Sequence, residues 1–128
     1  MKYLIALAFI MTTACQADES ITAFAGNVTA FTLRSIDGVT FAARATIDVS
    51  EAGKITGYGP CNRYFANQTA PYPWFSTGPI ESTRMACPDL TAEAQFFDAL
   101  RAMTLVEVLG GTLILSDDNG REMLFQAP

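Results

Sequence analysis

Alternating hydrophobic and polar positions predict β-strands through the first half of the chain. Apolar side chains occupy every odd position of residues 41–49, a pattern typical of a strand with one buried face. Asp37-Gly38 precedes this segment and favours a two-residue hairpin, because both positions tolerate a positive φ. The strand candidates in this half are residues 29–36, 40–49, 54–58, 63–68 and 73–77.

The second half changes to a helical period before it returns to strands. Apolar side chains recur at helical spacing over residues 91–102, with Asp89 or Thr91 as cap and Glu93 in the first turn. Three strand candidates follow, at residues 105–109, 112–116 and 121–126. The order of elements predicts an α+β fold, in which a curved antiparallel sheet or partial β-barrel of about 6–8 strands carries one covering helix.

The N-terminus has the pattern of an export signal. Lys2 precedes an apolar run over residues 4–11, and small residues lead to Cys15. This run is far shorter than the roughly 20 apolar residues that span a bilayer. The pattern resembles the bacterial lipoprotein signal, which implies cleavage before Cys15 and attachment of lipid to its sulfur. The alternative is a plain secretory signal, cut near Ala14 or Ala17, that leaves Cys15 lost or free.

These features divide the chain into three parts. Residues 1–14 form the signal, residues 15–28 a flexible tether from the lipidated cysteine, and residues 29–128 one domain. Gln16, directly after the cysteine, resembles the sorting pattern for the outer membrane. We therefore expect a location at the periplasmic face of the outer membrane, with the membrane as a partner through the lipid anchor.

Composition narrows the possible chemistry. The net charge is −5 and the chain has no histidine, which argues against nucleic-acid binding and excludes every histidine-based triad or metal site. Carboxylate, lysine or tyrosine chemistry stays open, but the sequence nominates no nucleophile together with its base. We predict a protein that is not an enzyme and that uses no metal or cofactor.

Two glycine-containing segments are the most specific motifs. Residues 57–65 read Gly-Tyr-Gly-Pro-Cys-Asn-Arg-Tyr-Phe, and residues 78–88 read Gly-Pro-Ile-Glu-Ser-Thr-Arg-Met-Ala-Cys-Pro. Together they resemble the signatures of META domains, the HslJ-like family, over about residues 31–126. The resemblance implies an association with heat shock or envelope stress, and no settled molecular activity.

The cysteines of these two motifs form the remaining pair if Cys15 carries lipid. An exported chain folds in an oxidising compartment, so we predict a structural disulfide between Cys61 and Cys87. A reactive redox pair is the alternative, and the missing Cys-x-x-Cys spacing disfavours it.

The polar members of the motifs allow two interpretations. Asn62, Tyr64, Thr83 and Arg84 either hold the loop backbone around the disulfide or line a binding surface. The six aromatic residues between positions 58 and 75 are expected mostly in the core.

We therefore expect a monomeric, non-enzymatic envelope lipoprotein. Its META domain would be a stress-associated binding or interaction module, with another envelope protein or a cell-wall component as partner. The alternative is a carrier that holds a small apolar ligand inside the curved sheet.

Overall fold

The computed structural model describes residues 17–128, which form two helices and nine strands. The helices are α1 (Ile21–Ala25) and α2 (Leu90–Ala102). The strands are β1 (Ala30–Ile36), β2 (Val39–Thr40), β3 (Thr46–Asp48), β4 (Lys54–Tyr58), β5 (Arg63–Asn67), β6 (Glu81–Ser82), β7 (Leu105–Leu109), β8 (Thr112–Ser116) and β9 (Glu122–Gln126).

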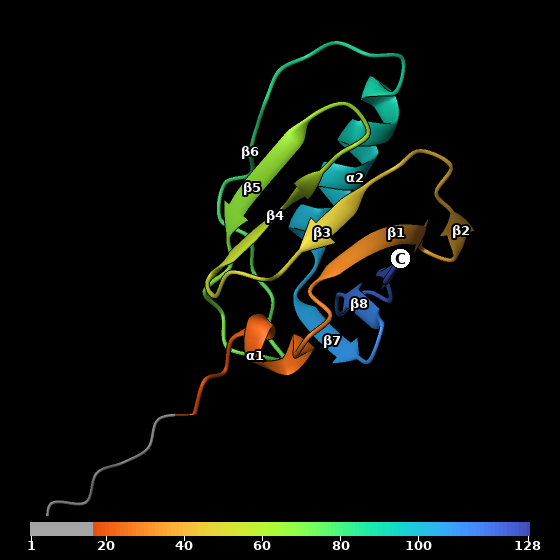
Figure 1. The fold of residues 1–128 in the computed structure, drawn as a ribbon. Helices are drawn as coiled ribbons and strands as arrows, with labels where there is room; N and C mark the ends of the chain where they lie inside the picture. Colours follow the sequence, from red (N-terminus) through yellow and green to blue (C-terminus); the bar gives the residue numbers. More distant parts are fainter. Residues whose placement is uncertain (1–16) are drawn as a thin grey trace, which may run out of the picture.

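All strand pairs are antiparallel and belong to one open, curved sheet (Figure 1). The order across the sheet is β6-β5-β4-β3-β1-β9-β8-β7, and β2 pairs with β1 outside this path. The predicted curved sheet with one covering helix is confirmed, and the sheet does not close into a barrel. Two strands, β2 and β6, have only two residues each, too few for an alternating pattern to reveal.

Helix α2 lies against the inner face of the sheet, where its apolar side forms much of the core (Figure 1). Phe96, Phe97, Ala99 and Leu100 of α2 are buried. The ring of Tyr64 on β5 meets the rings of Phe96 and Phe97 edge-on, with 5.5 Å between centroids in each pair. This packing ties α2 to the half of the sheet that carries the sequence motifs.

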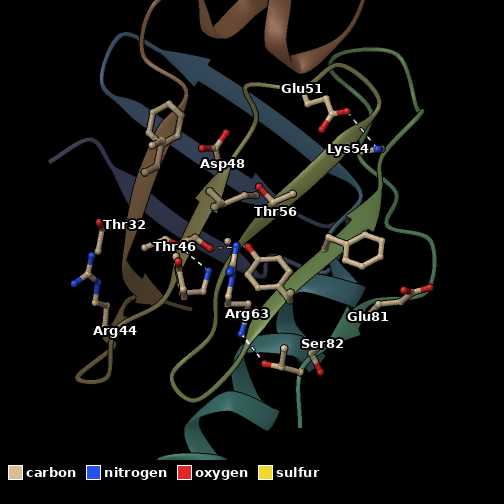
Figure 2. Close-up of a pocket in the computed structure, with 18 of the residues that line it drawn as sticks. Thr32, Arg44, Thr46, Asp48, Glu51, Lys54, Thr56, Arg63, Glu81 and Ser82 are labelled. Carbon is tan, nitrogen blue, oxygen red and sulfur yellow. Dashed lines mark hydrogen bonds and ion pairs between the residues drawn. The ribbon is translucent and has the colours of Figure 1, made fainter. Parts of the chain in front are cut away.

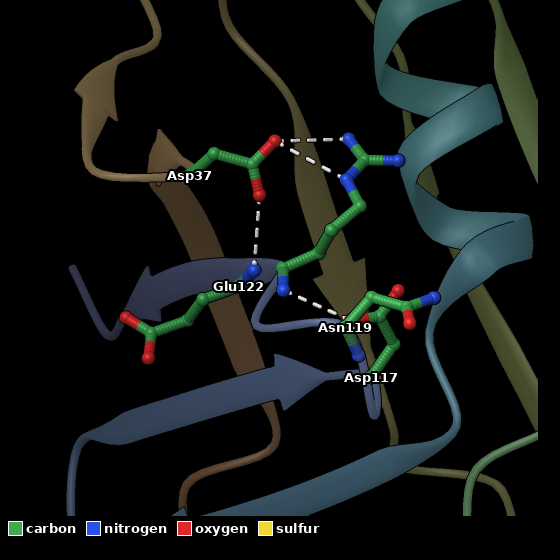
Figure 3. Close-up of polar contacts among 5 residues, drawn as sticks. Asp37, Asp117, Asn119 and Glu122 are labelled. Carbon is green, nitrogen blue, oxygen red and sulfur yellow. Dashed lines mark hydrogen bonds and ion pairs between the residues drawn. The ribbon is translucent and has the colours of Figure 1, made fainter.

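The first hairpin forms where the Asp-Gly pair predicts it, and a second contact fixes its position. Asp37 and Gly38 have φ values of 53° and 78°, the left-handed region that Asp and Gly tolerate. The Asp37 carboxylate accepts from the Glu122 amide at 3.0 Å and forms an ion pair with Arg121 at 3.1 Å (Figure 3). The Glu122 amide, and then the Arg121 guanidinium, lower the pKa of Asp37.

The prediction of one continuous strand over residues 40–49 is wrong, because residues 41–45 form a loop between β2 and β3. Thr32 pairs with Thr46 and Ser35 with Thr40, so between these pairs two residues of β1 lie opposite five residues of the partner segment. The three surplus residues leave the ladder between β2 and β3. The alternation of burial continues through this break, because Ala45, like Ile47 and Val49 beyond it, is buried.

The prediction of a strand at residues 73–77 is also wrong. Trp74 forms a single bridge with Leu105, and the prolines at positions 71 and 73 lack the N–H that a longer ladder requires. Instead, this segment covers the outer edge of β7. The Val106 amide donates to the Pro73 carbonyl at 2.8 Å.

Residues 21–25, which were predicted to be part of a flexible tether, form helix α1. The Ser20 hydroxyl caps this helix by accepting from the Ala23 amide at 3.2 Å, and Ile21 is buried. The Thr22 hydroxyl donates to the Val49 carbonyl at 2.6 Å. Five residues give too little periodicity to predict, and packing on the sheet stabilises so short a helix. Cys15 lies outside the described residues.

Candidate functional site

The two sequence motifs meet at one end of α2. Cys61 lies in the loop between β4 and β5, and Cys87 lies three residues before α2 begins. Their Cα atoms are 5.7 Å apart and a disulfide joins them, so the predicted pairing is confirmed. The disulfide links the β4–β5 loop to the segment that leads into the helix.

A buried carboxylate on α2 organises the loop beside this disulfide. Glu93 is 5% exposed. Its Oε2 accepts from the amides of Cys61 and Asn62, each at 2.7 Å, and its Oε1 accepts from Asn62 Nδ2 at 2.7 Å. A buried charge needs such donors to replace water, so the loop and the carboxylate stabilise each other.

Sequence reasoning assigned Glu93 only to the first turn of the helix and missed this role. A signal was present, because Glu93 lies three and four positions before Phe96 and Phe97. Residues at these spacings share one helix face. An acidic residue on the apolar face of a helix therefore indicates a buried polar contact.

The side chain of Asn62 is fully engaged inside the protein. Its Nδ2 donates to Glu93 and to the Met85 carbonyl at 3.2 Å. Its Oδ1 accepts from the Met85 amide at 2.7 Å and from the Thr83 hydroxyl at 3.0 Å. Two donors and two acceptor positions are the whole capacity of an asparagine amide, so Asn62 holds the two motifs together and offers no polar atom to a ligand.

Two glycines of the first motif allow close approach at this point. A Cβ on Gly59 would lie 2.8 Å from Glu93 Oε2 and 3.3 Å from Phe97 Cζ. A Cβ on Gly57 would collide with the backbone carbonyl of Thr46. The glycine-rich lead-in is therefore required by packing around the buried carboxylate and the neighbouring strand.

The other polar members of the motifs divide between interior and surface. Tyr64 is buried, and its hydroxyl donates to the Thr46 carbonyl at 2.6 Å; burial raises its pKa far above the usual range. The Thr83 hydroxyl accepts from the Arg63 amide at 3.2 Å. Arg84 is exposed. This geometry supports the structural interpretation for Asn62, Tyr64 and Thr83.

A groove of about 880 Å³ lies on the outer face of the sheet, across β1, β3, β4, β5 and β6 (Figure 2). Tyr58 and Phe65 line it and are 53% and 46% exposed. The Arg63 guanidinium lies 5.5 Å from the centre of the Tyr58 ring. We expected these aromatic residues mostly in the core, but the alternation along β4 and β5 turns these two rings to the outer face.

The rim of the groove carries charges of both signs. Lys54 forms an ion pair with Glu51 at 3.3 Å, and Asp48 and Glu81 lie at other points of the lining (Figure 2). Both partners of the Lys54–Glu51 pair are largely exposed, so the pair adds little to stability. The outer face thus combines accessible aromatic rings with solvated charged groups.

The family model of the META domain matches residues 23–128. The chain belongs to the META domain family. The match covers the sheet from β1 to β9, helix α2 and both motifs. It begins within helix α1, which places this helix partly inside the family's domain.

Two solved structures share the fold of this META domain. One is an NMR structure of a protein from Burkholderia xenovorans, with a TM-score of 0.63 and 22% identity, covering 94% of this chain and 97% of that chain. The second is an NMR structure with a TM-score of 0.58 and 22% identity, covering 77% of this chain and 88% of the other. No curated protein matches the chain.

Within residues 17–128, no group of three or more acidic or cysteine side chains is arranged to hold a metal ion. Neither described helix has the length and apolar character needed to cross a membrane.

Proposed function

We propose that this META-domain protein is a non-enzymatic, lipid-anchored envelope protein of the HslJ-like kind. In this proposal Cys15 carries the lipid, and the domain works at the periplasmic face of the outer membrane as a stress-associated interaction module. The signal pattern before Cys15 supports the anchor. The disulfide between Cys61 and Cys87 suits an oxidising compartment.

The binding surface in this proposal is the groove on the outer face of β3 to β6. The observation that carries it is the exposure of Tyr58 and Phe65, side by side with charged groups, on two neighbouring strands. Leaving two large rings in water is unfavourable, and exposed rings rimmed by polar residues mark interaction sites. The polar side-chain atoms of Asn62 and Tyr64, in contrast, form hydrogen bonds inside the domain.

The structure favours an interaction module over the alternative of an apolar carrier. Phe96, Leu100 and Met103 fill the space between α2 and the sheet and are at most 2% exposed. A ligand inside the sheet would have to displace these side chains. The outer groove is already open to solvent, so a partner can bind there without rearranging the core.

Site-specific photo-crosslinking tests the groove. A photoreactive amino acid replaces Phe65 in cells under envelope stress, and the matched control carries it at Val39, an exposed residue of β2 outside the groove. We expect an adduct of reproducible mass at position 65 that is absent at position 39. Mass spectrometry of the adduct separates an envelope protein from a cell-wall fragment. Equal labelling at both positions would exclude the groove as the binding surface.

The anchor is tested separately. Labelled palmitate should enter the protein, and Cys15→Ser should abolish the label and release the protein from the membrane fraction. Continued labelling of the Cys15→Ser protein would exclude this attachment site. Fractionation of the wild-type protein by density would then place it in the inner or outer membrane.

A further inference from the structure

Three large apolar side chains are exposed around the edge strand β7, and none of them lines the groove. Phe24, Trp74 and Leu109 are 51%, 58% and 76% exposed. They come from helix α1, from the segment that covers β7, and from the end of β7 itself. We call these three residues the apolar end of the domain.

Contacts within the protein bring the three residues to one region. The Phe24 ring stacks on the Tyr72 ring with 4.0 Å between centroids, and the Tyr72 hydroxyl accepts from the Val108 amide at 3.1 Å. Trp74 pairs with Leu105, directly across the edge of β7. Phe24 and Trp74 are thus fixed along the same strand that ends at Leu109, and α1 and β7 lie together in Figure 1.

The chain enters the domain at this same end. Ser20 caps α1, and the Glu19 carbonyl accepts from the Tyr72 amide at 2.7 Å. From Cys15 to Ser20 is five residues, which span at most about 18 Å when fully extended. A lipid on Cys15 would therefore hold Ser20, at the start of α1, within about 18 Å of its own attachment point.

We propose that the apolar end docks on the lipid bilayer, with Trp74, Phe24 and Leu109 inserted at the boundary between headgroups and acyl chains. This inference rests on the lipid anchor of the proposed function. Tryptophan suits that boundary, because its ring is apolar and its N–H can bind water or headgroups. The short connection to Cys15 selects the bilayer as occupant, since the surface is held beside it at high local concentration.

The charges beside the apolar end indicate how it binds. Glu19 and Glu107 are both exposed and acidic, so attraction to anionic lipids does not drive docking. Binding should therefore tolerate salt and occur on zwitterionic vesicles. β7 and β6 are opposite edges of the sheet, so the part of the groove on β5 and β6 lies toward the edge opposite the docked one.

Trp74 is the one tryptophan of the sequence, so its fluorescence reports on the apolar end alone. The lipoprotein is reconstituted in phosphatidylcholine vesicles with and without lipids brominated near the headgroup. Docking predicts a shift of the emission to shorter wavelength and loss of intensity with brominated lipid, both unchanged by high salt. The same lipoprotein with unperturbed, unquenched emission would overturn docking while leaving the anchor intact.

Matched variants separate docking from tethering. Phe24→Ser with Leu109→Ser should restore most of the quenched emission, whereas Val39→Ser, at an exposed position on β2, should leave the quenching unchanged. Circular dichroism checks that each variant is folded. If the double variant unfolds, Leu109→Lys alone serves, because Leu109 is exposed beside a turn. Equal quenching of the folded variants and the wild type would overturn the proposed surface.

A second experiment tests docking even if cells attach no lipid to Cys15. The purified chain is coupled through the Cys15 thiol to a maleimide-bearing lipid, and Trp74 is measured in the same vesicles. Quenching supports docking although the natural anchor has failed, and its absence overturns docking. A blue shift without vesicles, accompanied by dimers in sedimentation, would assign the apolar end to a second copy of the chain and overturn the bilayer as its occupant.

Discussion

Replacing the buried Glu93 with glutamine should lower the free energy of unfolding by about 2–4 kcal/mol, although it changes little in shape. The carboxylate accepts two backbone amides at Oε2 and Asn62 Nδ2 at Oε1. A glutamine oxygen placed at Oε2 keeps the two backbone bonds. Each bond then falls from a charge-assisted one, worth about 1.5–3 kcal/mol, to a neutral one, worth about 0.5–1.5 kcal/mol.

The other half of the new amide creates the larger conflict. It would place an NH₂ opposite Asn62 Nδ2, at a position where the two atoms are now 2.7 Å apart. Asn62 cannot turn its amide over, since its Oδ1 accepts from the Met85 amide and the Thr83 hydroxyl. One buried donor without an acceptor costs about 1–3 kcal/mol. Removing the buried charge also removes its desolvation cost, which offsets part of these losses. The net loss is the value of about 2–4 kcal/mol given above.

Urea unfolding followed by circular dichroism, with the disulfide intact, measures this loss. Glu107→Gln, at an exposed position of β7, is the matched control and should stay within about 0.5 kcal/mol of wild type. Adding Asn62→Asp to Glu93→Gln places an acceptor opposite the new donor. The double variant should therefore be about 1–2 kcal/mol more stable than the sum of the two single changes predicts. A Glu93→Gln protein as stable as the control would refute the reasoning.

Three further predictions concern the same domain. Gly59→Ala should cost about 1–3 kcal/mol in the same urea assay, because its Cβ meets the buried carboxylate, whereas Gly78→Ala, with its nearest contact at 3.8 Å, should cost less than half as much. Replacing both Cys61 and Cys87 with alanine should cost about 3.5 kcal/mol by opening a 26-residue loop, and an unchanged urea midpoint would contradict a stabilising disulfide. Asp37 has a pKa below its usual 3.8, so its ionised form contributes to the free energy of unfolding above pH 3.8, and this contribution is lost as the pH falls through the lowered pKa. The difference in unfolding free energy between the wild type and Asp37→Asn, measured in the same urea assay, should therefore shrink on acidification.

Local patterns in the sequence predicted the elements whose stability is local. The Asp37-Gly38 turn depends on two backbone conformations, and helix α2 on its apolar period and first-turn acid. The pairing of Cys61 with Cys87 followed from the redox compartment and the cysteine count. None of these predictions required knowledge of which strands become neighbours.

The features that sequence reasoning missed depend on contacts between distant segments. The loop between β2 and β3 reflects a change of register along β1, which pairs through residues 30–32 with β3 and through residues 35–36 with β2. The role of Glu93 depends on a loop 31 residues away in the chain. The aromatic residues between positions 58 and 75 were expected mostly in the core, but Tyr58 and Phe65 are exposed, because the position of α2 decides which face of β4 and β5 is covered.

The way the two edges of the open sheet end has a consequence for aggregation. An edge of unpaired amides and carbonyls is a template on which another extended chain can add. At β7 the amides of Val106 and Val108 are already bound to Pro73 and Tyr72, and at the other edge β6 offers only two residues, Glu81 and Ser82. Within residues 17–128, neither of these two edges therefore offers another unfolded chain a long row of free backbone groups to pair with. A closed barrel resists polymerisation because it has no edge strands. This open sheet resists polymerisation because one edge is covered and the other is short.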